Sequence, residues 1–360
     1  MKALLAAVAI AIAGALALVA SIVAANRSTS ATDTPSTVAG HSGMTQAASA
    51  TVKGISYAGT TVDNAEALAK ARRPYPAALP PVPAGDVAKV RMVLKDVTIQ
   101  IAPGIKYAAW GFQGGVPGPI VHVRQGQTVE MTLTNGGAIP HSIDFHAARI
   151  APNLAFVDVN PGKSFTFRFT ANDPGVYMYH CGTKPVLAHI ANGMYGAIVV
   201  DPKTPLAPAA KSYVLVASEW YLNASGTGKP AQLDMDKARS VMPDWATFNG
   251  YARQYVDHPL TARPGDLVRF YVVDAGPSLT TAFHIVGTIL NKVYPDGDMT
   301  PGHELTGIQT FDVPAGGGAV FEVKIDQPGL YPFVSHSFAS VDMGQVGPLK
   351  VGNPQGSMSH

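Results

Sequence analysis

This sequence has few cysteines and few charges. A single cysteine, Cys181, among 360 residues excludes an intrachain disulfide, a zinc ribbon and an iron–sulfur cluster. Charged residues make up 14% of the chain, and 26 basic against 24 acidic residues leave a formal net charge of +2, which argues against nucleic-acid binding. A Cys-x-x-Cys-His haem motif is also absent. The role of the one thiol is therefore the main question that the sequence poses.

The first 25 residues form a leader. Residues 3–25 carry no charge, and the run is long enough to cross a bilayer, while Val23-Ala24-Ala25 would suit cleavage by a signal peptidase. We expect either a cleaved signal peptide or an N-terminal membrane anchor. In both cases the rest of the chain is exported and works in the periplasm or elsewhere outside the cytoplasm.

A linker follows the leader. Residues 26–85 begin with a stretch rich in Ser, Thr, Ala and Gly, which predicts a disordered tether. A short helix is expected at Asp63–Arg72, and the Pro-rich stretch Pro74–Pro83 resists regular structure and marks a domain boundary. Residues 354–360 form a tail.

Beyond residue 85, apolar and polar residues alternate with a period of two. The apolar positions of three such stretches are Val129, Met131 and Leu133; Phe165, Phe167 and Phe169; and Phe321, Val323 and Ile325. This alternation predicts half-buried antiparallel strands, and the turn residues between them recur at the spacing of a β-sandwich. The sequence therefore predicts an all-β fold.

Part of this pattern occurs twice. Adding 154 to the residue number carries Phe167 onto Phe321, Pro174-Gly175 onto Pro328-Gly329, and Tyr177 onto Tyr331. We therefore expect two tandem β-sandwich domains, at 86–204 and 211–353, with about the size of ordinary domains. The same offset places Cys181 on Ser335, so chemistry that needs a thiol is confined to the first copy.

The residues around Cys181 are the types that bind copper. His141 precedes it in a predicted strand, and His189 and Met194 follow it in a Cys-x7-His-x4-Met spacing. A thiolate, two imidazoles and a weak axial thioether are the ligands of a blue-copper site, because soft sulfur stabilises Cu(I) while imidazole suits both oxidation states. A buried cysteine and a core methionine are the alternative, and the upstream His141 favours copper.

Side-chain direction separates a second group of residues. Neighbours in an extended strand point to opposite faces, so if Cys181 points into its sandwich, His180 points outward. Asp144 and His146 stand at odd separations from His141 and would share the outer face. We expect His146 and His180 to bind a second metal, with Asp144 beside it.

The second copy adds two histidines in strand-like segments, His284 and His336. A catalytic metal usually has three protein ligands and one open position, so His146 and His180 alone are incomplete. The residues leave two interpretations open: one of these histidines completes the site, or both are ordinary strand histidines.

Taken together, these segments resemble the copper-containing nitrite reductases. The resemblance covers 86–353 and rests on His141-Ser-Ile-Asp-Phe-His146, His180-Cys181, His189, Gly193-Met194, Phe283-His284-Ile-Val286 and Val334-Ser-His336. It implies two Greek-key, cupredoxin-like domains and two coppers per chain. The implied ligands are His141, Cys181, His189 and Met194 for a type 1 copper, and His146, His180 and His336 for a type 2 copper.

The resemblance also implies an assembly and a reaction. The family forms homotrimers in which the neighbouring subunit supplies His336, and Asp144 and His284 match its two catalytic residues. The implied reaction is the reduction of nitrite to nitric oxide in denitrification, with an electron from a cupredoxin or a c-type cytochrome.

Two departures from the family pattern affect these expectations. The loop 182–188 is one residue shorter than in well-known members, which affects the colour and potential of the type 1 site. Val286 replaces an isoleucine of the substrate pocket, which affects how nitrite is oriented and held.

Two other functions are alternatives. A two-domain multicopper oxidase, similar to a laccase, needs several His-x-His pairs, and this chain has none. A non-catalytic electron carrier would use the type 1 site alone and would leave Asp144, His146, His284 and His336 without a role.

Overall fold

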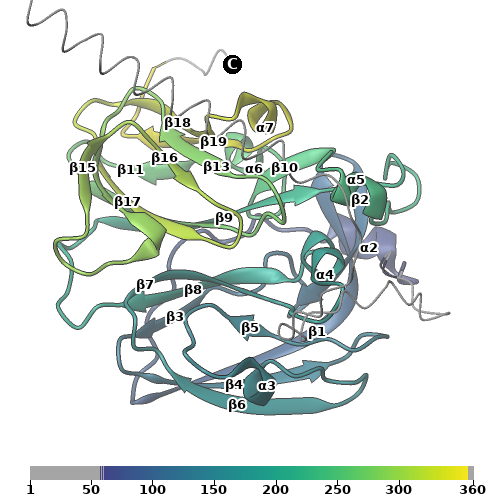
Figure 1. The fold of residues 1–360 in the computed structure, drawn as a ribbon. Coiled ribbons are helices and arrows are strands. Elements are labelled where there is room, and N and C mark those ends of the chain that lie inside the picture. The colour runs from purple at the N-terminus through teal and green to yellow at the C-terminus, as the bar shows by residue number, and fades with distance from the viewer. Residues whose placement is uncertain (1–56, 58, 60, 356–360) are drawn as a thin grey trace, which may run out of the picture. The chain divides into compact units, whose positions relative to one another are not determined.

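The structure, a computed structural model, describes residues 57, 59 and 61–355. The expected leader at 1–25 and the expected tether up to residue 56 lie outside the described residues, as do residues 356–360. None of the helices in the described part is both long and apolar enough to cross a membrane. Strands dominate this part and form the two β-sandwiches of the predicted all-β fold (Figure 1).

The first sandwich contains two four-stranded sheets. One has the order β2-β1-β4-β6 and consists of β1 (Val87–Ala102), β2 (Ile105–Phe112), β4 (Thr128–Asn135) and β6 (Ser164–Thr170). The other has the order β3-β8-β7-β5 and consists of β3 (Val121–Arg124), β5 (Asp144–Phe145), β7 (Gly175–His180) and β8 (Tyr195–Asp201). The predicted alternation is visible in β6, where Phe167 and Phe169 are buried and the polar residues between them are exposed.

The second sandwich has larger sheets. One has the order β10-β9-β12-β17-β14-β15 and consists of β9 (Lys211–Trp220), β10 (Trp245–Phe248), β12 (Leu267–Asp274), β14 (Leu290–Tyr294), β15 (Leu305–Ile308) and β17 (Gly318–Lys324). The other has the order β11-β19-β18-β13-β16 and consists of β11 (Leu260–Ala262), β13 (Thr281–Ile285), β16 (Thr310–Val313), β18 (Gly329–Ser335) and β19 (Val346–Val351).

The internal repeat is visible strand by strand. An offset of 154 carries β6 onto β17 and the start of β7 onto the start of β18, whereas an offset of 139 carries β4 onto β12. The two offsets differ by 15 residues, and the second copy is longer between β13 and β17, where it contains β14, the 3₁₀ helix η1 (Pro295–Gly297) and β15. Strands β14 and β15 extend the larger sheet beyond β17.

An apolar layer joins the two sandwiches. Val176 and Met178 of β7 pack with residues of β8, β9, β12 and β17, while Tyr179 and Cys181 belong to the core of the first sandwich. Strand β7 is therefore buried on both faces, and its even-numbered residues face the second sandwich. This arrangement sets the opposite directions of the two residues at its end, His180 and Cys181.

The helices of residues 61–355 are short and lie in the connections. Helix α2 (Ala65–Lys70) falls within the predicted range Asp63–Arg72, and the Pro-rich stretch forms only an isolated bridge, between Ala78 and Tyr213. The others are α3 (Pro152–Ala155), α4 (Val186–Ala191), α5 (Met235–Arg239), α6 (Gln254–Asp257) and α7 (Phe338–Asp342). Helix α4, which the strand pattern did not predict, returns the chain toward Cys181.

Candidate metal centres

The structure brings His141, Cys181 and His189 together in the core of the first sandwich. The Sγ atom of Cys181 lies 3.3 Å from Nδ1 of His189 and 3.9 Å from Nδ1 of His141, and the two Nδ1 atoms are 3.0 Å apart. All three side chains are fully buried. The residues come from the loop before β5, from the end of β7 and from α4, so the fold and not sequence proximity assembles the cluster.

This cluster has the protonation and donor set of a cation site. Burial, together with the charge of His189, lowers the pKa of His141 to about 3, and burial lowers the pKa of His189 to about 4 although Asp158 opposes the shift. Both imidazoles are therefore neutral at pH 7. Burial raises the pKa of the Cys181 thiol, and a bound cation would supply the positive charge that its thiolate needs. Two nitrogen donors and one sulfur donor converge, which fits a soft metal.

Hydrogen bonds fix the thiol from one side. The backbone N–H of Ser142 donates to Sγ of Cys181 at 3.3 Å. The Ser142 hydroxyl in turn accepts from the N–H of Gly182 at 3.0 Å and lies 3.1 Å from the Thr183 hydroxyl. The Thr183 hydroxyl donates its proton to Oδ1 of Asp158 at 2.7 Å. Sequence reasoning missed these residues, because nothing in their spacing shows that they surround a sulfur atom.

Met194 and Trp110 complete the buried surroundings. Met194 is fully buried in the same apolar cluster as Cys181, and its backbone carbonyl accepts the N–H of Cys181 at 3.1 Å. The indole ring of Trp110 packs against the imidazoles of His141 and His189, with centroids 5.1 and 5.0 Å away. Trp110 was not predicted as part of the site.

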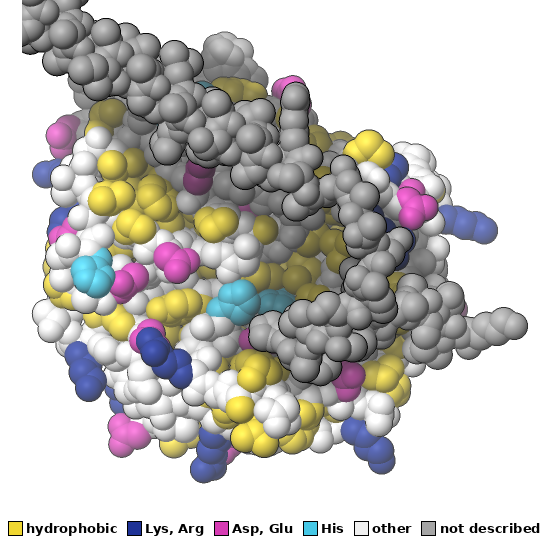
Figure 2. Space-filling view, viewed as in Figure 1, with side chains coloured by type: hydrophobic (Ala, Val, Ile, Leu, Met, Phe, Trp, Pro, Cys, Tyr) yellow, Lys and Arg dark blue, Asp and Glu magenta, His cyan; other side chains and the backbone are white. Residues whose placement is uncertain are grey.

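A second cluster contains Asp144, His146 and His180. Asp144 and His180 are direct partners in the pairing of β5 with β7, and Oδ2 of Asp144 lies 3.9 Å from Nε2 of His180. The Nε2 atoms of His146 and His180 are 3.0 Å apart. His146 is exposed and Asp144 is half-buried, and Figure 2 shows histidine side chains at the surface near the level of β5.

Backbone carbonyls determine the tautomers of both histidines in this second cluster. The Nδ1–H of His146 donates to the carbonyl of Gly316 at 3.0 Å, and the Nδ1–H of His180 donates to the carbonyl of Cys181 at 3.0 Å. With these protons on Nδ1, both Nε2 lone pairs face one another. Burial lowers the pKa of His180, which favours its neutral form. Two converging lone pairs, each with a carbonyl behind its ring, match the outer hydrogen bonds of metal-binding histidines.

The structure does not bring His284 and His336 to either cluster. Within the described residues, the group around His146 contains Asp144 and His180 only. His284 and His336 instead lie beside one another on the second sandwich, with ring centroids 5.5 Å apart. His336 and the neighbouring side chains of Val286 and Phe338 are exposed, the last two at 42% and 56%. One chain thus presents two incomplete histidine pairs at its surface.

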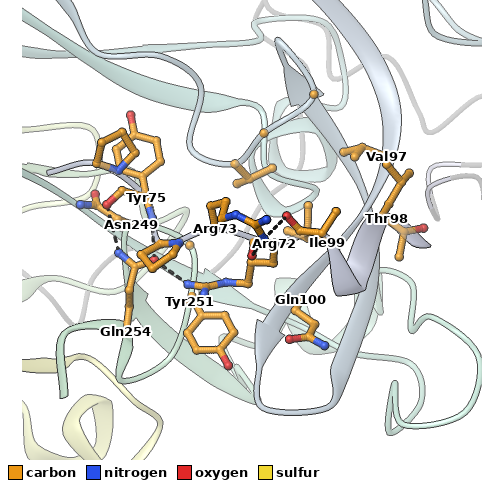
Figure 3. Close-up of a pocket in the computed structure, with 18 residues that line it drawn as sticks. Arg72, Arg73, Tyr75, Val97, Thr98, Ile99, Gln100, Asn249, Tyr251 and Gln254 are labelled. Carbon is orange, nitrogen blue, oxygen red and sulfur yellow. Dashed lines mark hydrogen bonds between the residues drawn. The ribbon is translucent and has the colours of Figure 1, made fainter. Parts of the chain in front are cut away.

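Two cavities differ in their relation to these clusters. A cavity of about 270 Å³ lies beside His146 and is also lined by Tyr177, Asp296 and Gly316. A larger one, of about 370 Å³, lies between the segment 71–76, β1 and the 249–254 loop (Figure 3). There the guanidinium of Arg72 stacks on the Tyr251 ring at 3.5 Å. Among the described residues, no histidine, cysteine or carboxylate lines this larger cavity.

Comparisons with known sequences match this chain to copper proteins. The multicopper oxidase family matches residues 94–205. The copper-containing nitrite reductase of Neisseria gonorrhoeae is 40% identical over 272 residues, which cover 73% of this chain and 69% of that protein. The copper-containing nitrite reductase of Alcaligenes faecalis is 29% identical over 288 residues, covering 74% and 76%.

Solved structures of copper proteins are also similar to this chain. The copper nitrite reductase of Nitrosomonas europaea is similar to this chain with a TM-score of 0.68 and 32% identity, over 76% of this chain and 98% of that one. A multicopper oxidase is similar with a TM-score of 0.64 and 28% identity, over 74% and 89%.

Proposed function

This chain belongs to the copper-containing nitrite reductases, and from that premise we propose that it reduces nitrite to nitric oxide and water with one electron and two protons. It is an oxidoreductase built of two tandem cupredoxin-like Greek-key sandwiches. One observation carries the proposal: a buried thiol–imidazole cluster and a partly exposed imidazole–carboxylate cluster are joined through two adjacent residues, Cys181 and His180. We assign the sandwiches to domains at 86–204 and 211–353, the first of which carries both clusters.

The proposed type 1 site uses His141, Cys181, His189 and Met194. When bound, copper supplies a one-electron couple. Burial of the three clustered side chains excludes water, and the packing of Trp110 holds both imidazoles in place. Because these residues are held by the core, their positions change little between oxidation states, which favours electron transfer.

The proposed type 2 site uses His146 and His180 of one chain and His336 of a neighbouring chain in a homotrimer. The support is the exposure of His146 and His336 and their separation within one chain. A ring-shaped trimer places one surface of each copy against a different surface of the next. His284 would arrive at the same site with His336, because the two are neighbours.

Residues beside the proposed type 2 site bind the substrate and supply the protons. Nitrite is an anion, and neutral imidazole ligands leave the site cationic, which favours its binding. We assign Asp144 to hydrogen-bond nitrite and to donate one proton, and His284 to supply the second. The His284 Nδ1 atom lies 2.5 Å from the carbonyl of Gln309, which leaves Nε2 for this task. Val286 would form part of the substrate pocket.

The electron enters at one cluster and is used at the other. His180 and Cys181 are consecutive, so the ligands of the two sites are linked by a short covalent path. A second connection runs through the hydrogen bond from Nδ1 of His180 to the carbonyl of Cys181. The chain has no haem motif of its own, and we assign the role of electron donor to a separate cupredoxin or c-type cytochrome.

The decisive test is nitric oxide formation measured with an electrode, using nitrite and a reduced donor under argon. We expect nitrite-dependent nitric oxide and two coppers per chain. A multicopper oxidase would instead consume oxygen with a phenolic donor, and an electron carrier would bind one copper and form no nitric oxide. Either of those results would refute the proposal.

The trimer has its own test, which uses two inactive variants. His336→Ala and His180→Ala should each lose the type 2 copper. If a site combines residues of two chains, co-expression of the variants restores about a quarter of the sites, because random mixing in a cyclic trimer pairs the intact halves at that frequency. A site built within one chain would show no restoration.

The cellular setting is also a proposal. Export to the periplasm, with retention through residues 3–25 or cleavage after them, and a role in denitrification agree with the family. Fractionation of cells, with and without residues 3–25, would locate the protein.

A further inference from the structure

A short segment from outside the sandwiches lies over the buried cluster. The Tyr57 ring contacts the His189 imidazole edge-on, with centroids 6.3 Å apart and an interplanar angle of 61°. Trp110 packs on His189 at 5.0 Å. His189 is fully buried, although its Nε2 atom has no hydrogen-bond partner among the described residues.

Side chains of the core hold this segment. The amide nitrogen of Asn192 donates to the carbonyl of Tyr57 at 2.8 Å, and that of Gln232 donates to the carbonyl of Gly59 at 2.7 Å. Asn192 is fully buried, follows α4, and also donates to the carbonyl of Ala188 at 2.9 Å. The loop that carries His189 therefore also anchors Tyr57.

Gly59 shows that the path of the segment is specific. Its φ of +69° lies in the left-handed region, and a Cβ atom there would stand 2.3 Å from the carbonyl oxygen of Ala108. Only glycine combines this conformation with this close approach. Tyr57 and Gly59 accept these side-chain hydrogen bonds and, among the described residues, belong to no strand or helix, so Tyr57 can separate from His189 without disrupting a sheet.

We propose that Tyr57 is a removable cover over His189, which keeps water away from the cysteine–histidine cluster and sets the access of an electron donor to it. The assignment rests on the proposed function for the identity of the metal, but not for the contact itself. In the copper-loaded protein a dry surrounding favours the reduced, less charged state. Removal of the ring should therefore lower the reduction potential of the type 1 site.

The single cysteine makes the cover measurable without copper. In the copper-free full chain, a neutral disulfide reagent can react only with Cys181. We expect Tyr57→Ala to raise the labelling rate by roughly tenfold or more, because labelling of a buried thiol is limited by local opening, and Tyr57→Phe to leave it unchanged. Gly59→Ala and Gln232→Ala should raise it as well, since they release the segment and keep the ring.

A matched control is Tyr251→Ala, which removes another half-buried tyrosine, in the cavity of Figure 3. It should leave the labelling rate as in the unchanged chain. Equal rates for the unchanged chain and Tyr57→Ala would overturn the proposal. So would an unchanged potential in copper-loaded Tyr57→Ala that keeps its visible band. Failure of the unchanged chain to form nitric oxide would refute the proposed function and leave the labelling result standing.

Discussion

The two sandwiches share an architecture and differ at the positions that matter for chemistry. Cys181 of the first copy corresponds to Ser335 of the second, and both are fully buried at the end of equivalent strands. The Ser335 hydroxyl accepts the backbone N–H of Ala282 at 3.2 Å, whereas the Cys181 sulfur faces two imidazoles. The same buried position thus makes a hydrogen bond to the backbone in the second copy and places a sulfur atom beside two imidazoles in the first.

A charged pair is reversed between the copies. Glu130 and Arg168 pair across β4 and β6, and the equivalent positions in β12 and β17 hold Arg269 and Glu322. The Arg168 side chain is 65% exposed, whereas those of Arg269 and Glu322 are 8% and 5% exposed. Arg269 also donates to the carbonyl of Ala207 at 2.7 Å. In the second copy this charged pair is buried, and Arg269 is neutralised by Glu322 and hydrogen-bonded to a backbone carbonyl.

The strand before each site ends in a similar turn. The side-chain oxygen of Asn135 accepts the N–H of Gly137 at 2.8 Å, and Oδ1 of Asp274 accepts the N–H of Gly276 at 2.8 Å. The turn is conserved between copies, but only the second buries a carboxyl group in it. The comparison shows that the first copy places a sulfur atom beside two imidazoles, whereas the second copy satisfies the equivalent buried positions with structural hydrogen bonds.

Exchanging the cysteine and serine positions gives the largest expected effect. Cys181→Ser should abolish the visible band and donor-driven nitrite reduction, because the thiolate ligand is lost, while the type 2 electron-resonance signal persists. Ser335→Cys should add no copper, since Ser335 is fully buried whereas the adjacent His336 is exposed. Metal analysis and visible spectra measure both. A visible band that survives in Cys181→Ser would contradict the ligand assignment.

Asp144→Asn tests the proton donor and should have the next largest effect. The amide keeps the shape of the carboxylate but cannot donate its proton, so we expect turnover to fall roughly 10²- to 10⁴-fold. Both coppers and the visible band should remain. Steady-state nitric oxide formation, together with metal content, measures the change, and full activity would remove Asp144 from this role.

The reversed charge pair predicts unequal stability effects. Glu322→Gln leaves Arg269 charged, buried and without its ionic partner, which should lower the free energy of unfolding by about 3–5 kcal/mol. Glu130→Gln, the equivalent change in the first copy, should change it little, because water solvates Arg168. Denaturant titration of both variants measures the difference. If both variants lost the same free energy of unfolding, the buried pair would contribute no more to stability than the exposed pair, which would contradict the prediction.

The buried turn carboxyl predicts a smaller, pH-dependent effect. Burial raises the pKa of Asp274 to about 7, from the value of about 4 of an ordinary aspartate. Between these values the folded state binds a proton that the unfolded state has lost, so this group makes the free energy of unfolding fall as pH rises toward about 7 and adds no slope above it. Asp274→Asn should remove that contribution. Denaturant titrations across this range should give a shallower slope for the variant, and an identical slope would contradict the shift.

Much of the fold follows from local sequence pattern. The alternation at Phe165–Phe169 and Phe321–Ile325 predicted strands that the structure has as β6 and β17, and the offset of 154 relates them residue by residue. The repeat did not reveal the extra strands β14 and β15. They lie before β17, whereas the offset of 154 relates the residues from β6 and β17 onward. Helix α4 was also missed, since its few residues have no sustained period.

For the candidate site too, local pattern predicted some features and tertiary packing decided the others. Strand parity placed His180 away from Cys181, and the structure brings His180 to His146 and Asp144. Contacts that depend on tertiary packing were not predictable, as the carbonyl of Gly316 and the ring of Tyr57 show. Both come from parts of the chain that are remote in sequence from the residues they contact.

The hydrogen bond between His146 and Gly316 constrains how the protein matures. Gly316 belongs to the second copy, so the first copy, if expressed alone, would lack the acceptor that holds this histidine in its metal-binding tautomer. We therefore expect loading of the proposed type 2 site to require the folding of both halves. If the gene were divided between the halves, we expect the fragments to bind metal at the proposed type 2 site only after they associate.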